Sequence, residues 1–291
     1  TMRLVTFTTN LDRSVTRPER RLGVQCLADP ANPDGDFSVI DLTAVGGFPP
    51  TMRGFLEDGA ASSDKAKACV ETGQHRLPAS AVRLLAPIYD CEKVICIGMN
   101  YHDHCTEQGL PVPTEPVIFN KFPSAISAPG DDIPLIHTEA LDWEVELAVV
   151  IGRDCRNVKA ADAMSYVAGY TVAHDVSARD IQLKKNGGQW LLGKTYDGYA
   201  PIGPAIITAD EIDPHNLKLR CLVNGDVVQD SSTKELVFNV PAIIEYCTRY
   251  FTLKAGDLIF TGTPPGVGCF RKPPVFLKDG DKVVVEIEKI G

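Results

Sequence analysis

The stretch that most constrains the fold covers residues 142–151, because it places acidic side chains at the start of an apolar strand. Acidic and apolar residues alternate over its first half, which is the two-residue period of a β-strand. Side chains two apart share a face, so Glu144 and Glu146 are predicted to point into one space, with Trp143 and Val145 packed behind them. The second half is apolar at every position, which indicates a buried strand. Carboxylates that enter such a place need a cation or a proton nearby.

A second apolar strand, predicted over residues 166–176, brings a third acid to the same region. It delivers Asp175 just before residues 177–180, whose Ser-x-x-Asp spacing predicts a capped helix start. Three carboxylates without a neighbouring thiolate form an all-oxygen site, which suits Mg²⁺, Mn²⁺ or Ca²⁺ better than zinc. The alternative is an exposed strand whose acids meet water or lysines.

Composition limits the classes of partner. The net charge of -9 and the lack of a basic run argue against binding to nucleic acid or to an anionic membrane. No apolar run reaches the length of a membrane span. Residues 1–5 already look strand-like and show no signal peptide or presequence, but a presequence that has been removed would leave the same start. Nine scattered cysteines do not suggest a disulfide framework, so we expect an intracellular, reducing compartment.

The N-terminal part is predicted to be a small α+β domain, residues 1–88, without a catalytic cluster. Strands are expected at residues 2–8, 22–27 and 37–42, followed by one or two helices across residues 52–71. A larger domain, residues 89–291, is expected to begin with a strand at residues 93–98.

The helix predicted at residues 101–108 carries a pair of chemical interest. His104 and Glu107 lie three apart on one face, where the carboxylate can orient the imidazole as a general base. The alternative is a solvated pair in a loop. Several prolines follow in residues 109–116, which predicts a mobile connection and places the pair on a lid. Nearby cysteines and histidines match no zinc spacing.

Residues 188–195 match the phosphate-loop pattern, but their context argues against that function. A phosphate loop follows a strand and opens a helix, whereas a helix is predicted to precede this segment. We instead expect a packed strand that ends at Lys194. Such a strand would carry its ammonium toward Asp175, while the local sequence by itself favours a solvated surface lysine. The preceding helix, residues 178–185, places Arg179 and Gln182 on one face, where they can hold a carboxylate.

The C-terminal part contains four more predicted elements and a tight loop. They are a hairpin around residues 217–229, a helix at 240–251, and strands at 257–260 and 282–287. The loop at residues 261–268 suits a position beside a ligand, with Thr263 as a donor, or a plain structural turn.

Taken in chain order, these segments resemble the fumarylacetoacetate hydrolase superfamily over residues 90–291. The resemblance rests on residues 98–101, His104 with Glu107, Glu144-x-Glu146, Asp175 with Arg179 and Asp180, Lys194, and residues 261–268. It implies an α+β fold with a mixed β-roll catalytic domain and a homodimer. It also implies Mg²⁺ on Glu144, Glu146 and Asp175, and His104 with Glu107 as a dyad on a flexible lid. The resemblance further implies that the substrate is surrounded by Lys194, Arg179, Gln182 and Thr263. It implies a mitochondrial location if the source is a eukaryote and a cytoplasmic location otherwise.

The implied chemistry is that of a 2-oxo acid whose enolate is stabilised by the cation. Keto-enol tautomerisation of oxaloacetate is the expected reaction, with Lys194 or His104 moving the C3 proton. Hydrolysis of an acylpyruvate or a related C–C bond, and decarboxylation of oxaloacetate, use the same enolate and remain alternatives. A non-catalytic dimer that keeps the metal for stability is the alternative from another class.

Overall fold

The computed structural model describes residues 2–33 and 35–291, so the prediction that concerns Thr1 lies outside the described residues. The N-terminal strands and helices fall where the sequence predicts them, with two short strands and one short helix in addition. The bounds are β1 Arg3–Thr8, β2 Arg21–Leu27, β3 Phe37–Asp41, α1 Leu42–Val45, α2 Met52–Glu57, α3 Ala60–Thr72, β4 Arg76–Pro78 and β5 Arg83–Leu84.

The remainder of the chain forms the larger part of the molecule and contains the predicted hairpin, helix α8 and last strand. Its strands are β6 Val94–Gly98, β7 Val117–Lys121, β8 Ile126–Ser127, β9 Leu141–Asp142, β10 Val145–Ile151, β11 Val167–His174, β12 Ser177–Ala178, β13 Ala200–Thr208, β14 Lys218–Val223, β15 Asp226–Ser232, β16 Leu258–Phe260 and β17 Val283–Ile287. Its helices are α4 His102–Gln108, α5 Ala160–Ala163, α6 Arg179–Lys184, α7 Leu191–Lys194 and α8 Val240–Tyr250.

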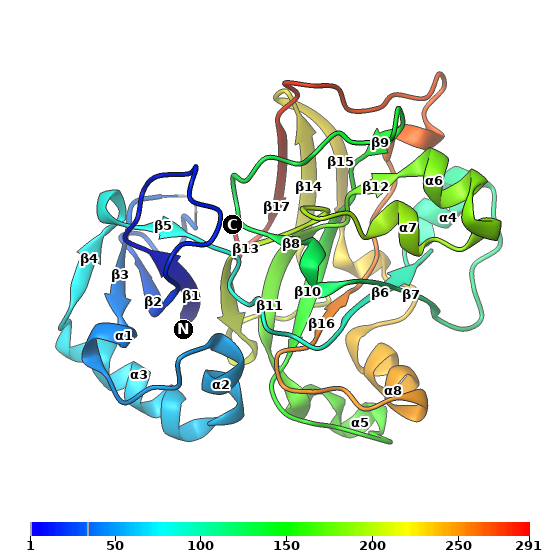
Figure 1. Ribbon diagram of the computed structural model, residues 1–291. Helices are drawn as coiled ribbons and strands as arrows, with labels where there is room; N and C mark the ends of the chain where they lie inside the picture. The colour runs from blue at the N-terminus through cyan, green and yellow to red at the C-terminus, as the bar shows by residue number, and fades with distance from the viewer. Residues whose placement is uncertain (1, 34) are drawn as a thin grey trace.

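One mixed sheet connects the two parts of the chain (Figure 1). Its order is β4-β3-β2-β1-β13-β11-β10-β16-β6-β7, with β16 and β6 parallel. The N-terminal strands join it where β1 pairs with β13, at Arg3 opposite Ile207. The fold is therefore the predicted α+β class with a mixed sheet. A boundary near residue 88 remains a prediction.

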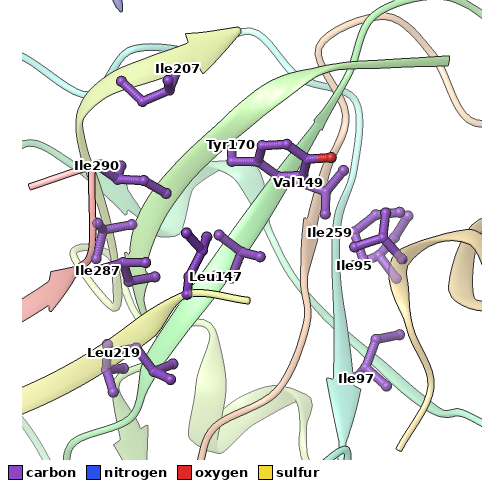
Figure 2. Close-up of a cluster of buried hydrophobic side chains, with 14 of the residues drawn as sticks. Ile95, Ile97, Leu147, Val149, Tyr170, Ile207, Leu219, Ile259, Ile287 and Ile290 are labelled. Carbon is purple, nitrogen blue, oxygen red and sulfur yellow. The ribbon is translucent and has the colours of Figure 1, made fainter. Parts of the chain in front are cut away.

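The strand β10 separates two apolar layers. Its odd positions, including Leu147 and Val149, pack with the small sheet formed by β15, β14 and β17. Figure 2 shows part of this layer, with Ile95, Ile97, Leu147, Val149, Tyr170, Leu219, Ile259 and Ile287 gathered together. The even positions Ala148 and Val150 face the other layer, which contains Cys96, Phe119 and Phe260. Glu146 has the same parity, so it points toward that second layer.

Two predictions about the segments around the acids are wrong. The strand is not continuous from Asp142 to Val145: β9 ends at Asp142 and pairs with β12, and β10 begins at Val145, so Glu144 lies in the break. Ser177 does not cap a helix, because it lies in β12 and donates its hydroxyl to the carbonyl of Asp175. Helix α6 therefore begins at Arg179, after an uncapped Ala178.

All nine cysteine thiols are free. Within residues 2–33 and 35–291, no helix combines the length and the apolar composition that crossing a bilayer requires.

Candidate metal centre and active site

Four strand ends meet at one edge of the large sheet and form the site. β10 is antiparallel to both β11 and β16, so its first residues lie beside the last residues of those two strands. β6 is parallel to β16, so its end reaches the same edge and leads into helix α4. Helices α4, α6 and α7 lie over this edge (Figure 1).

The three predicted metal ligands are brought together and buried. The backbone N–H of Asp175 donates to the carbonyl of Glu144 at 3.0 Å, which fixes the two residues side by side. Carboxylate oxygens of Glu144, Glu146 and Asp175 lie within 4.8 Å of one another. These residues are 6%, 1% and 0% exposed. No other group of three potential ligands is found in the described part of the chain.

Two of these carboxylates are already paired with cations. Lys194 Nζ lies 2.7 Å from Glu144 Oε2 and 3.0 Å from Asp175 Oδ2. Arg179 Nη2 lies 2.6 Å from the other oxygen of Glu144. Burial raises the pKa of Glu144, but Lys194 and then Arg179 outweigh it, so the carboxylate is ionised at neutral pH.

Glu146 has no such partner. Its Oε2 accepts a hydrogen bond from the backbone N–H of Gly262 at 2.7 Å, and among the described residues it makes no ion pair. Burial, followed by repulsion from Asp175 and Glu144, raises the pKa of Glu146 well above its usual value. An unpaired buried carboxylate costs several kcal/mol unless it is neutralised. The position therefore calls for a proton or a cation.

The residues fit a divalent cation with oxygen ligands. Three cations, Lys121, Lys194 and Arg179, face four buried carboxylates, because Asp142 also belongs to the network. One negative charge is left over, and it lies on Glu146 beside Glu144 and Asp175. A hard cation is the chemistry that this donor set selects.

Asp142 is a site residue whose role the sequence did not reveal. It is fully buried and accepts from Arg179 Nε at 2.8 Å, and from the backbone N–H groups of Gly268 and Cys269 at 2.6 and 3.0 Å. It thus holds Arg179 against the loop that follows β16. Its alternation with Glu144 suggested a shared face, but no local signal reveals these distant partners.

Lys121 is the second residue that the sequence analysis missed. It comes from the edge strand β7, is 1% exposed, and lies 2.6 Å from Asp175 Oδ1. Its ammonium also donates to the carbonyls of Val176, Tyr199 and Lys194. A period of two from Phe119 places Lys121 on the buried face, and this was the available signal.

We expect Lys121→Met to lower the free energy of unfolding by about 3–5 kcal/mol, because it removes the cation beside Asp175 Oδ1 and the donor to three buried carbonyls. Urea unfolding followed by circular dichroism measures this change. Lys254→Met is the control, since Lys254 pairs with the exposed Asp154 at 2.6 Å and its replacement is expected to change the free energy of unfolding far less. Equal losses in the two variants would contradict the role assigned to Lys121.

Lys194 reaches the site from a helix and not from the predicted strand. Helix α7 is a single turn, and the side chain of Gln189 accepts from the backbone N–H of Leu191 at its start. A Cβ atom on Gly193 would lie 2.5 Å from the backbone nitrogen of Gln182, so only glycine lets α7 approach α6 this closely. The glycine and lysine of the phosphate-loop match thus serve packing and charge pairing.

The other predicted site residues surround one cavity of about 330 Å³. Arg179 Nη1 donates to Gln182 Oε1 at 3.0 Å, which leaves the Gln182 amide NH₂ as a donor. Thr263 also lines the cavity, but its hydroxyl already donates to the carbonyl of Val145. The predicted residues that line the cavity are His104, Glu144, Glu146, Arg179, Gln182, Lys194 and Thr263.

His104 and Glu107 form the predicted pair on helix α4. His104 Nδ1 and Glu107 Oε2 share a hydrogen bond of 3.1 Å, and His104 is buried against Phe270. The other oxygen of Glu107 accepts from the backbone N–H of Gly266 at 3.0 Å. The pair therefore lies on a helix and not in a loop, with His104 buried and Glu107 exposed to solvent.

Comparisons with a protein-family model and with related sequences point to the same family. Residues 93–291 match the model described as fumarylacetoacetate (FAA) hydrolase C-terminal. Over the full chain and 88% of the relative, the sequence is 53% identical to "Oxaloacetate tautomerase fahd2, mitochondrial" of Xenopus laevis. It is 54% identical to the human "Oxaloacetate tautomerase FAHD2A, mitochondrial" over 87% of this chain and 82% of that one.

Solved structures agree with the sequence matches. Fumarylacetoacetate hydrolase from Exiguobacterium antarcticum superposes with a TM-score of 0.82 at 36% identity, covering 100% of this chain and 97% of that one. Maleylpyruvate hydrolase from Sphingobium, solved with manganese(II) and pyruvate, gives a TM-score of 0.79 at 31% identity, covering 100% and 96%.

Proposed function

Because the chain belongs to the fumarylacetoacetate hydrolase family, we propose that it is a divalent-metal-dependent enzyme that interconverts the keto and enol forms of oxaloacetate. The observation that carries this proposal is Glu146, a buried carboxylate without a cationic partner, which lies beside Glu144 and Asp175 and lines a cavity shared with Lys194 and His104. A purely structural ion would not require the last two side chains.

The contacts of each side chain suggest its role in metal binding, substrate binding or proton transfer. A divalent ion held by Glu144, Glu146 and Asp175 supplies Lewis-acid stabilisation of charge on the substrate oxygens. Arg179 and Gln182 hold the substrate carboxylate, with Thr263 at the cavity wall. Burial lowers the pKa of Lys194, but Asp175 and Glu144 more than offset this and raise it, so Lys194 carries a proton that it gives to C3 of the enol and takes back in the reverse direction. His104 is the alternative carrier of that proton.

The decisive test measures the decay of enol-oxaloacetate with Mg²⁺ and after chelation. We expect a large acceleration over the buffer rate that chelation removes and that Mg²⁺ restores. The same samples are analysed for pyruvate and CO₂, which report decarboxylation, and acetylpyruvate is supplied separately to detect C–C hydrolysis. A decay rate equal to that of buffer with Mg²⁺ would refute the tautomerase. Turnover of acetylpyruvate alone would replace it with the hydrolase alternative.

The His104–Glu107 pair on α4 supports C–C bond hydrolysis as the second candidate reaction, because a positioned imidazole can activate water. We expect Glu107→Gln to lower any acetylpyruvate hydrolysis about 10- to 100-fold and to leave Mg²⁺ affinity unchanged, since the amide no longer stabilises a protonated His104. Asp103→Asn is the control, because Asp103 lies on the same helix and binds Ser231 Oγ at 2.6 Å instead. Calorimetry with Mg²⁺ and product analysis separate the two effects.

Three further properties complete the proposal. Mg²⁺ is the proposed native ion, Mn²⁺ or Ca²⁺ being the alternatives, and metal analysis of protein purified without chelator identifies it. A homodimer is proposed, and light scattering after gel filtration measures the mass. A mitochondrial location is proposed from the names of the relatives, and fractionation of the source cells checks it.

A further inference from the structure

The cavity has a charged floor and an apolar wall. The floor contains the acids with Arg179 and Lys194. Six apolar residues also line the cavity and are defined here as the apolar wall: Met99, Leu110, Phe119, Leu183, Trp190 and Phe270. The volume of about 330 Å³ exceeds what a four-carbon acid needs, so part of a small dicarboxylate's surroundings would be apolar.

The lysine and arginine side chains of the cavity lie at its acidic floor, where Lys194 Nζ is also 5.0 Å from the ring centroid of Phe119. Arg179 and Lys194 are the lysine and arginine side chains among the described residues that line the cavity, and both are held by buried carboxylates. A 2-oxo acid that places its first carboxylate and its oxo group at the floor has its C3 substituent facing the wall. An apolar group there gains contacts with the wall.

The wall is shaped by aromatic packing. Trp190 meets Phe119 edge to face, with ring centroids 5.2 Å apart. This position requires Gly98, because a Cβ atom there would lie 2.8 Å from the indole ring. Phe270 lines the same cavity and packs against His104, with ring centroids 5.9 Å apart. Aromatic edges and faces of this kind favour a planar ring as ligand.

We propose that the site also ketonises the enols of 2-oxo acids that carry an aryl group at C3, with the ring against the apolar wall. This proposal rests on the tautomerase function above. The reaction needs no co-reactant: the enol O–H bond breaks, its electron pair forms the C2 carbonyl, and the former double-bond pair forms the new C3–H bond. One proton leaves oxygen and one arrives at carbon.

The enol form of phenylpyruvate is the probe, and its decay is measured beside that of enol-oxaloacetate with Mg²⁺ present. We expect catalysis of both enols. A second readout does not depend on turnover. Calorimetric titration of the Mg²⁺-loaded protein is expected to give a Kd about tenfold lower for phenylpyruvate than for pyruvate, because the ring buries apolar surface.

A matched pair of variants tests whether the wall is responsible. Leu183 and Leu192 are each 48% exposed, on α6 and α7, but only Leu183 lines the cavity. Leu183→Lys places a cation at the wall and is expected to lower the ratio of kcat/KM, aryl acid over oxaloacetate, about tenfold. Leu192→Lys is expected to leave this ratio unchanged.

The outcomes separate the two proposals. Catalysis with oxaloacetate but not with enol-phenylpyruvate, or equal Kd values for phenylpyruvate and pyruvate, overturns the aryl specificity and leaves the tautomerase intact. An equal change of the ratio in both lysine variants overturns the role of the wall. Catalysis with neither enol overturns both proposals.

Discussion

Replacing Glu146 by glutamine is expected to abolish binding of the divalent cation and to lower tautomerase activity about a hundredfold or more, while the protein remains as stable as before or becomes more stable. Glutamine has the shape of a protonated glutamate and still accepts the Gly262 N–H bond. It removes a buried carboxyl group whose charge no described cation offsets and whose pKa is raised by burial and by Asp175 and Glu144. Loss of that desolvation cost explains the expected gain in stability. Calorimetry with Mg²⁺, the enol-decay assay and thermal unfolding without metal measure the three effects.

Glu144→Gln is the control for this prediction, because it changes the same chemical group in a different charge environment. Glu144 balances Lys194 and Arg179, so the amide leaves two buried cations short of a partner. We expect this variant to lose about 3–5 kcal/mol of stability in the absence of metal. If both variants are destabilised equally, Glu146 is not the uncompensated member of the trio.

The parts of the site that can be predicted from the sequence are those set by residue spacing within a single strand or helix. The positions of Glu146 and Asp175 follow from apolar strands that end at acids, and His104 with Glu107 follows from helical spacing. These patterns hold because strand and helix periods are set by the backbone alone. Their meeting at one edge of the sheet, however, depends on β10 running antiparallel to β11 and β16.

The missed features depend on contacts between distant segments. Lys121 binds Asp175 across 54 positions of sequence, and nothing near Lys121 indicates a carboxylate partner. The break at Glu144 arises because β9 pairs with β12 and not with the strands beside β10. The helical turn that carries Lys194 resembles a buried strand in composition, since Trp190, Leu191 and Leu192 suit either, and packing of Gly193 on Gln182 decides between them.

Replacing Lys194 by methionine is expected to have the opposite effect on metal binding from the Glu146 variant, although both lose activity. The ammonium of Lys194 occupies Glu144 Oε2 and Asp175 Oδ2, which belong to the carboxylates that hold the cation. Its removal takes away a competing positive charge, so we expect Mg²⁺ to bind as tightly as before or more tightly. Activity nevertheless falls about 10²–10⁴-fold, because the proposed proton carrier to C3 is absent.

The stability of this variant should depend on the metal. Without Mg²⁺, Glu144 retains only Arg179 and Asp175 retains only Lys121, so the free energy of unfolding is expected to fall by about 2–4 kcal/mol. Saturating Mg²⁺ replaces the lost charge and should restore most of that stability through its binding energy. Thermal unfolding at increasing Mg²⁺ tests this, with Glu146→Gln as the variant that gains nothing from the metal. If the Lys194→Met protein binds Mg²⁺ and retains full turnover, Lys194 is not the proton carrier and His104 takes that role.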